Sequence, residues 1–246
     1  MALIAPALLA GDFARLGEAL RIVEAAGGRM IHLDVADGHF AREITVGLPV
    51  LQSIRRATRL ELDVHLLIER PERFVPEFVS AGADRVAVHP ESTPHLHRAL
   101  TLIRQSGAKA GVALEPGTPL GCVEDVLDEL DFLSILTADP LFKPGFAAGP
   151  AEAGFIPAGL GKLRQALRMR EARDLRFQLQ AEGGVGRTNL DALVLAGADI
   201  LVGDFAIFQR SDVVAQLSEL IRRAAHSDDT RPGRAPSTGK GFPQGS

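Results

Sequence analysis

The sequence contains a single cysteine, Cys122, and no large excess of charge of either sign. One cysteine excludes an internal disulfide framework. The 27 basic and 31 acidic side chains give a formal net charge of −4. The chain therefore has neither the broad basic field that attracts nucleic acid nor the polybasic patch that attracts a membrane surface. These absences favour a small-molecule partner.

The first residues, Met1 to Pro6, lack the basic segment and the long apolar core of an export signal. We therefore expect a cytoplasmic protein. The chain has 246 residues, 46% of them hydrophobic. That is enough to bury a full core, and it is close to the roughly 250 residues of a single eight-fold α/β barrel.

Short apolar runs alternate with stretches of helical periodicity along most of the chain. Every predicted strand is followed by a predicted helix, which requires parallel pairing, and eight such units favour closure into a (β/α)8 TIM barrel. The predicted strands are residues 3–6, 30–34, 60–65, 85–89, 109–114, 132–137, 177–182 and 200–203. The predicted helices are residues 15–26, 50–57, 71–81, 93–106, 121–128, 158–171, 189–196 and 211–225.

After Ala225 the composition changes to a segment rich in proline, glycine and serine without apolar periodicity. The sequence therefore predicts one barrel domain over residues 1–225 and a disordered tail over residues 226–246.

Polar side chains close three of the predicted strands. His32 and Asp34 lie two residues apart, as do Asp63 and His65, so the members of each pair point to the same side of their strand. Glu182 ends the seventh strand. In parallel barrels the reactive groups gather at the carboxyl ends of the strands. We therefore expect His32, Asp34, His65 and Glu182 to converge.

Two imidazoles and two carboxylates form a suitable cage for a divalent metal ion. For any one of these residues alone, a hydrogen-bonded core position is the more common explanation. Four of them at matching strand ends favour metal-assisted acid/base chemistry, with Asp34 and Glu182 as the acid and the base. His89, which ends the fourth strand, is either a partner that orients a ligand or a satisfied buried histidine.

Several motifs in order along the chain resemble the ribulose-phosphate 3-epimerase family. The resemblance runs from residue 3 to about residue 224. It is carried by Ile4-Ala5-Pro6, Gly11-Asp12-Phe13, Ile31-His32-Leu33-Asp34-Val35, Asp37-Gly38-His39-Phe40, Asp63-Val64-His65-Leu66, Thr93-Pro94-His95, Pro116-Gly117-Thr118-Pro119-Leu120, Phe155-Ile156-Pro157 and Gly183-Gly184-Val185.

This resemblance implies a (β/α)8 barrel that binds one divalent metal ion through two histidines and two aspartates. It also implies that the two acids exchange the proton at C3 of a ketopentose phosphate through an enediolate. By position, His32, Asp34 and His65 match three ligands, and Asp34 also matches one acid/base residue. Glu182 stands where the family has its second aspartate.

The chain departs from the family pattern where the substrate is expected to bind. Ala7 replaces a serine that contacts substrate, and the family's lid is replaced by Asp139–Phe146. Asp204 and Phe205 stand in a segment whose backbone amides help to hold the phosphate in the family. Loops after strands seven and eight form the usual phosphate site of such barrels. We expect the substrate to contact Ala7, His65, Gly183, Gly184, Asp204 and Phe205.

Three interpretations remain open on the sequence alone. The protein is an epimerase of the ribulose-phosphate type with an altered phosphate site, a related enzyme for a different or unphosphorylated sugar, or a homologue without catalysis. The resemblance also implies a homo-oligomer. The ligand set suits zinc, iron, manganese and cobalt alike.

Overall fold

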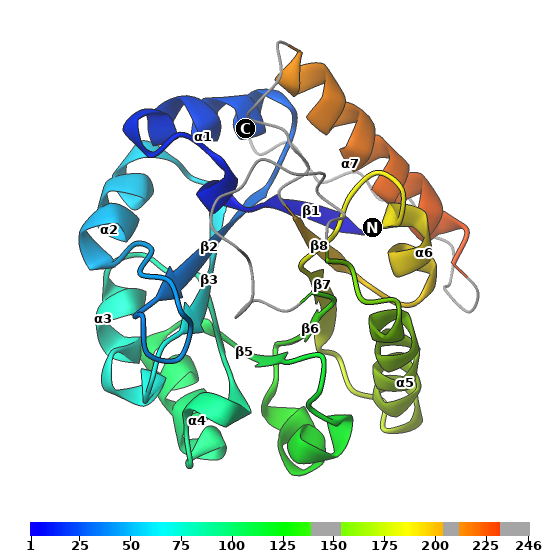
Figure 1. Cartoon of the computed structure of the whole chain (residues 1–246). Helices are drawn as coiled ribbons and strands as arrows, with labels where there is room; N and C mark the ends of the chain where they lie inside the picture. Colours follow the sequence, from blue (N-terminus) through cyan, green and yellow to red (C-terminus); the bar gives the residue numbers. More distant parts are fainter. Residues whose placement is uncertain (139–153, 204–211, 232–246) are drawn as a thin grey trace, which may run out of the picture.

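Eight parallel strands form the inner ring of the molecule. The computed structural model describes residues 1–138, 154–203 and 212–231. Adjacent strands pair in the order β1-β8-β7-β6-β5-β4-β3-β2, and Figure 1 shows the helices outside them. The strands are β1 (Leu3–Pro6), β2 (Met30–Ala36), β3 (Glu61–Leu67), β4 (Arg85–Val88), β5 (Lys109–Leu114), β6 (Phe132–Leu136), β7 (Gln178–Glu182) and β8 (Ile200–Gly203).

The helices bury one apolar face against this ring. In α4, for example, Ala99, Leu100 and Ile103 are fully buried, at the spacing of one helical face. Within the described part of the chain, no helix has the length and apolar character needed to cross a membrane. The α-helices are α1 (Leu16–Ala25), α2 (Leu48–Ala57), α3 (Val75–Ser80), α4 (Leu96–Ser106), α5 (Ala158–Ala172), α6 (Leu190–Leu195) and α7 (Val213–Asp229).

The ring closes between β1 and β2, where a single parallel bridge joins Ala7 to His32. All other neighbouring strands are joined by continuous parallel ladders. The predicted (β/α)8 barrel is therefore confirmed. The closing bridge also places His32, one of the predicted site residues, at this seam.

Alternation along the strands separates two environments. In β2, Ile31, Leu33 and Val35 belong to the large apolar core shared with the helices. The residues between them, His32 and Asp34, point to the opposite side, into the barrel. The barrel interior therefore combines small apolar clusters with buried polar side chains, and these polar side chains supply the candidate site.

Two segments that the periodicity predicts as α-helix are 3-10 helix instead. Leu120–Glu129 is a 3-10 run between β5 and β6, and Pro71–Arg73 is a 3-10 turn that precedes α3. In the first segment Leu120 and Val123 are both buried. Their spacing of three residues is one full turn of 3-10 helix, so an apolar pattern of threes and fours fits either helix type.

The last helix continues beyond Ala225, where the sequence predicts its end. α7 reaches Asp229, and Arg231 beyond it is buried. The Arg231 guanidinium donates to the backbone oxygens of Gly197 and Ala198 and forms an ion pair with Asp228. These contacts fix the chain as far as residue 231, whereas the rest of the predicted tail, residues 232–246, lies outside the described residues.

A test of packing inside the barrel is Gly111→Ala. A Cβ atom at Gly111 of β5 would lie 2.2 Å from the Phe132 ring, and that ring also packs against the Arg85 guanidinium, 3.9 Å from the ring centroid. We expect this substitution to lower the free energy of unfolding by about 1–3 kcal/mol through overpacking, measured by urea denaturation. Gly121→Ala is the control, since nothing lies within 4 Å of the added Cβ. Equal stability of the two variants would contradict the prediction.

Candidate metal centre and active site

Four side chains from three strands converge at one end of the barrel. β2 supplies His32 and Asp34, β3 supplies His65, and β7 supplies Glu182. The parallel register places Asp34 opposite His65, and Glu182 comes from the other side of the ring. Asp34 Oδ1 lies 3.1 Å from His32 Nε2 and 3.2 Å from His65 Nδ1. Glu182 Oε1 lies 3.5 Å and 2.6 Å from the same two nitrogens.

The size and chemistry of this cluster fit a divalent cation. Each residue offers one nitrogen or oxygen ligand atom, and the four atoms lie within 4.8 Å of one another. A cation about 2 Å from each ligand would place opposite ligand atoms roughly 4 Å apart. His32 and His65 are fully buried and Glu182 is 5% exposed, so few waters compete for the ligands. The sequence-predicted set is thus brought together in full.

The electrostatics of the ligand-free cluster pair two positive with two negative groups. Burial alone would lower the pKa of His65, but Glu182 and Asp34 outweigh it and raise that pKa to about 9. The pKa of His32 is likewise raised well above its ordinary value by Glu182 and Asp34 against the effect of burial. The pKa values of Asp34 and Glu182 are lowered by the same imidazoles, although burial opposes this.

These shifts predict that metal binding releases protons. A metal-bound histidine must be a neutral imidazole, whereas His65, with a pKa raised to about 9, carries a proton at pH 7.5. The raised pKa of His32 favours its protonated form in the same direction. We therefore expect at least one proton, that of His65, to be released per divalent ion at pH 7.5. The number of protons released is obtained by calorimetry in several buffers, as the slope of the observed binding enthalpy plotted against the ionisation enthalpy of the buffer. The exposed His97→Ala variant should give the same slope, and a slope near zero would contradict the prediction.

His32 is held by a chain of buried charged groups. Its Nδ1 lies 2.8 Å from Asp63 Oδ2, and Asp63 Oδ1 accepts a hydrogen bond of 3.2 Å from Arg85 Nε. Asp63, Arg85 and His32 are 0–1% exposed. A carboxylate on one ring nitrogen fixes the imidazole so that the other nitrogen faces the metal site. Asp63 therefore orients a ligand from outside the cage.

His65 is held in a different way, by a second imidazole. Its Nε2 lies 2.7 Å from His89 Nε2, and the two rings are stacked with centroids 4.8 Å apart. On its far side, His89 Nδ1 lies 3.5 Å from a Glu91 oxygen. Of the two roles open to His89 on the sequence, its position favours that of a partner that orients a ligand.

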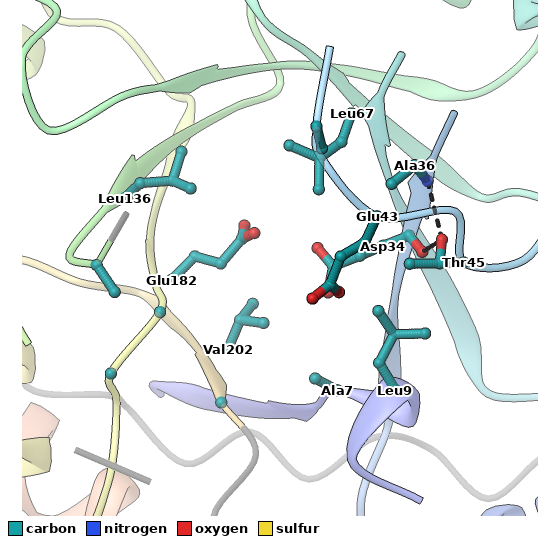
Figure 2. A pocket seen from close by; sticks show the side chains of 15 residues that line it. Ala7, Leu9, Asp34, Ala36, Glu43, Thr45, Leu67, Leu136, Glu182 and Val202 are labelled. Atoms are coloured by element: carbon teal, nitrogen blue, oxygen red, sulfur yellow. Dashed lines mark hydrogen bonds between the residues drawn. The ribbon is translucent and has the colours of Figure 1, made fainter. Parts of the chain in front are cut away.

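A pocket opens directly beside the cluster. Figure 2 shows Glu182 reaching into it from one side and Asp34 and Glu43 from the other. Apolar side chains complete the wall, and Ala7, Gly183 and Gly184, which the sequence predicts to contact substrate, also line it. The predicted His65 contributes to the cage. Asp204, Phe205 and the replaced lid at Asp139–Phe146 lie outside the described residues.

Comparison with known proteins identifies the family. Residues 3–208 match the ribulose-phosphate 3 epimerase family. The chain belongs to this family. It is 40% identical to ribulose-phosphate 3-epimerase of Bacillus subtilis over 218 residues, which covers 88% of this chain and 97% of that protein. It is 42% identical to the chloroplastic ribulose-5-phosphate-3-epimerase of Arabidopsis thaliana over 212 residues, or 85% of this chain and 73% of that protein.

Solved structures show the same fold in proteins of other families. The tryptophan synthase α-subunit of Pyrococcus furiosus superposes with a TM-score of 0.61 at 15% identity, covering 92% of this chain and 98% of that one. Thiamine phosphate pyrophosphorylase of the same organism gives 0.60 at 18% identity, covering 92% and 96%. At such low identity these matches concern the barrel alone, whereas the sequence matches concern the ribulose-phosphate 3-epimerase family.

Within this epimerase family fold, the glycine pair after β7 has a structural reason. Gly183 and Gly184 have φ of +89° and +64°, a region that favours glycine. A Cβ at Gly183 would lie 2.9 Å from the Ala138 Cβ, and one at Gly184 would lie 2.8 Å from the Phe155 Cα. The pair therefore lets the backbone turn tightly at the edge of the pocket.

Sequence reasoning missed Glu43. The loop after β2 folds back on itself: Gly38 N donates to Glu43 O, and the Thr45 hydroxyl donates to Asp34 O. These bonds turn the Glu43 side chain toward the pocket. A charged residue in a βα loop of a parallel barrel was the available signal, because these loops surround the active-site end.

Proposed function

We propose that this protein is a metal-dependent epimerase of the ribulose-phosphate 3-epimerase type. It would invert the carbon next to the ketone of a ketose phosphate by proton exchange through an enediolate. The observation that carries the proposal is that Asp34 and Glu182 take part in the cage and also line the pocket beside it. The named relatives at about 40% identity support the same activity.

Inversion at carbon requires one carboxyl group to remove a proton from one face and another to return a proton to the opposite face. Asp34 and Glu182 reach into the pocket from two sides, which suits these two roles. A bound divalent cation would stabilise the negative charge that develops on the substrate oxygens. Ala7, Gly183 and Gly184 would contact the substrate along the pocket wall, and His65 from the cage.

For the metal, we propose His32, Asp34, His65 and Glu182 as ligands of zinc, iron, manganese or cobalt. A mixed set of imidazole nitrogens and carboxylate oxygens suits each of these ions. We further propose that the protein acts in the cytoplasm as a homo-oligomer on a small sugar substrate, without nucleic-acid or membrane partners. Metal analysis and light scattering of the purified protein test the ion and the oligomer.

The deciding experiment is solvent deuterium exchange. The metal-loaded protein is incubated in D₂O with ribulose 5-phosphate, and deuterium at C3 is followed by NMR. Ribulose without phosphate is the parallel substrate. We expect exchange with the phosphorylated sugar. Absence of exchange in protein shown to contain bound metal would reject the proposed reaction. Exchange with unphosphorylated ribulose alone would reject the proposal that the substrate is a sugar phosphate.

A further inference from the structure

The two oxygens of the Glu182 carboxylate lie in different surroundings. Oε1 faces the cage, 2.6 Å from His65 Nδ1. Oε2 faces away from it and accepts a hydrogen bond of 2.9 Å from the Ser134 hydroxyl. The Gln180 amide nitrogen also donates to Oε2, at 3.4 Å. Two neutral donors thus hold one oxygen, and the other oxygen is left to face the imidazoles.

The strand register explains why these donors meet Glu182. β6 and β7 pair so that Ser134 lies opposite Gln180 and Leu136 lies opposite Glu182. Gln180 precedes Glu182 by two residues, so both side chains point to the same side of β7. Ser134 and Gln180 are both 0% exposed. A buried hydroxyl and a buried amide N–H are costly unless they are hydrogen bonded, and here the Glu182 carboxylate accepts from the Ser134 hydroxyl and from the Gln180 amide nitrogen. The Gln180 carbonyl oxygen has no hydrogen-bond partner among the described residues.

Gln180 also links the two halves of the site. Its amide nitrogen donates to Asp63 Oδ2 at 3.0 Å as well as to Glu182 Oε2. An amide NH₂ group has two hydrogens, one for each carboxylate. Asp63 is the residue that orients His32. The neutral Gln180 side chain therefore holds both Asp63, which orients the ligand His32, and Glu182, which is itself a proposed ligand. It does so without adding a charge between the two carboxylates.

The length of Glu182 makes this anchoring important. A glutamate has one more methylene and one more rotatable bond than the aspartate that the family resemblance implies at this position. The added length moves the oxygens by on the order of 1 Å, and a misplacement of that size can cost about a hundredfold in rate. An acid of this length needs additional contacts to fix its reacting oxygen.

We propose that Ser134 and Gln180 are positioning residues that hold Glu182 Oε2, so that Oε1 alone is presented to the metal and the substrate. The inference deepens the proposed function, on which it rests for the metal. Residues that orient a ligand from outside the coordination sphere are worth roughly 10–100-fold in metal affinity. The pair would thus adapt the site to a longer acid.

The first test is Mn²⁺ affinity, measured by calorimetry without substrate. We expect Ser134→Ala to weaken Mn²⁺ binding by about tenfold, and Gln180→Leu to weaken it at least as much because two carboxylates lose a donor. Ser134→Cys keeps the size and a weak S–H donor, so its loss should be intermediate. The control is Ser227→Ala, which removes a buried hydroxyl that donates to Asp191 elsewhere, and it should bind Mn²⁺ like the wild type.

The second test is a double-mutant cycle with Glu182→Asp. The shorter side chain withdraws the carboxylate from Ser134, so Ser134→Ala should have no further effect on Mn²⁺ affinity in the E182D background. An equal loss in both backgrounds would mean that Ser134 acts on general packing and would overturn the inference.

Exchange at C3 separates this inference from the proposed function. Loss of Mn²⁺ affinity in Ser134→Ala, with no exchange even in the wild type, rejects the reaction and leaves the positioning role standing. Normal exchange in the wild type, together with an unchanged Mn²⁺ affinity in Ser134→Ala, supports the proposed reaction and rejects the positioning role of Ser134. Wild-type protein that binds no Mn²⁺, zinc, iron or cobalt would overturn both.

Discussion

Asp34→Asn will lower the rate of deuterium exchange at C3 of ribulose 5-phosphate by about 10³-fold or more. The asparagine amide keeps the shape of the side chain but cannot take up a proton, and a general acid/base group contributes about 10²–10⁴-fold to rate. The amide is also a weaker ligand, since the carboxylate oxygen that lies 3.1 Å from His32 Nε2 becomes neutral. The exchange rate is measured by NMR at saturating Mn²⁺.

Saturation with metal is what makes the Asp34 result interpretable. Bound Mn²⁺ is quantified in the same samples, so a loss of rate at full occupancy reports the acid/base role rather than the ligand role. Asp125→Asn, an exposed substitution of the same chemical kind between β5 and β6, should exchange like the wild type. Exchange within tenfold of the wild type in Asp34→Asn would reject the assignment of Asp34.

Asp63→Ala is expected to have the largest effect on stability, a loss of about 3–5 kcal/mol in the free energy of unfolding. The reason is that Arg85 is fully buried and pairs with Asp63 Oδ1 at 3.2 Å. Removing the carboxylate leaves a buried guanidinium without this counter-charge. The loss is measured by denaturant unfolding of the metal-free protein at pH 7.

The pH dependence of the Asp63 effect has a definite sign. Burial opposes ionisation, but the hydrogen bond from His32 and the charge of Arg85 lower the pKa of Asp63. A lowered pKa stabilises the fold at pH values above the ordinary carboxyl pKa of about 4, and this contribution is lost as the pH falls further. The difference between wild type and Asp63→Ala should therefore shrink in acid.

The control for Asp63 is an exposed ion pair. Glu129 pairs with Arg104 at 2.8 Å on the surface, and Glu129→Ala should cost less than about 1 kcal/mol. If Asp63→Ala cost no more than this, the buried pair would contribute little to the stability of the barrel.

The sequence was sufficient to predict the barrel and the four residues that converge at its mouth. Alternation within β2 puts His32 and Asp34 on one side of the strand, and the strand ends of a parallel barrel face one rim. These two rules use only local spacing. They do not depend on the register between neighbouring strands, and so they also predicted correctly that His65 and Glu182 lie in the cluster.

The supporting contacts could not be predicted in the same way. Ser134 and Glu182 are 48 positions apart along the chain, and Asp63 and Gln180 are 117 apart. Such pairs depend on the register of β6 and β7 and on the curvature of the whole ring. The sequence did carry one signal: Ser134 is the single polar residue of β6, and Gln180 lies two positions before Glu182 on β7 and so shares its face.

The segment between β5 and β6 illustrates a limit of periodicity. Leu120, Val123 and Leu127 are buried at spacings of three and four, a pattern that α-helix and 3-10 helix both satisfy. The choice between them depends on hydrogen bonding to the third or the fourth residue, which side-chain pattern does not encode. Periodicity therefore located the element but not its type.

The join between β1 and β2 has a mechanical consequence. Backbone pairing there is limited to one bridge, made by His32 itself, while the cage that contains His32 spans the barrel to Glu182 on β7. A cation bound in that cage would link β2 and β3 to β7, and so would stabilise the barrel close to the join where strand pairing is weakest. Metal occupancy and the stability of the barrel would then be coupled. Removing the ion with a chelator would weaken the barrel at the join between β1 and β2 and would also abolish catalysis.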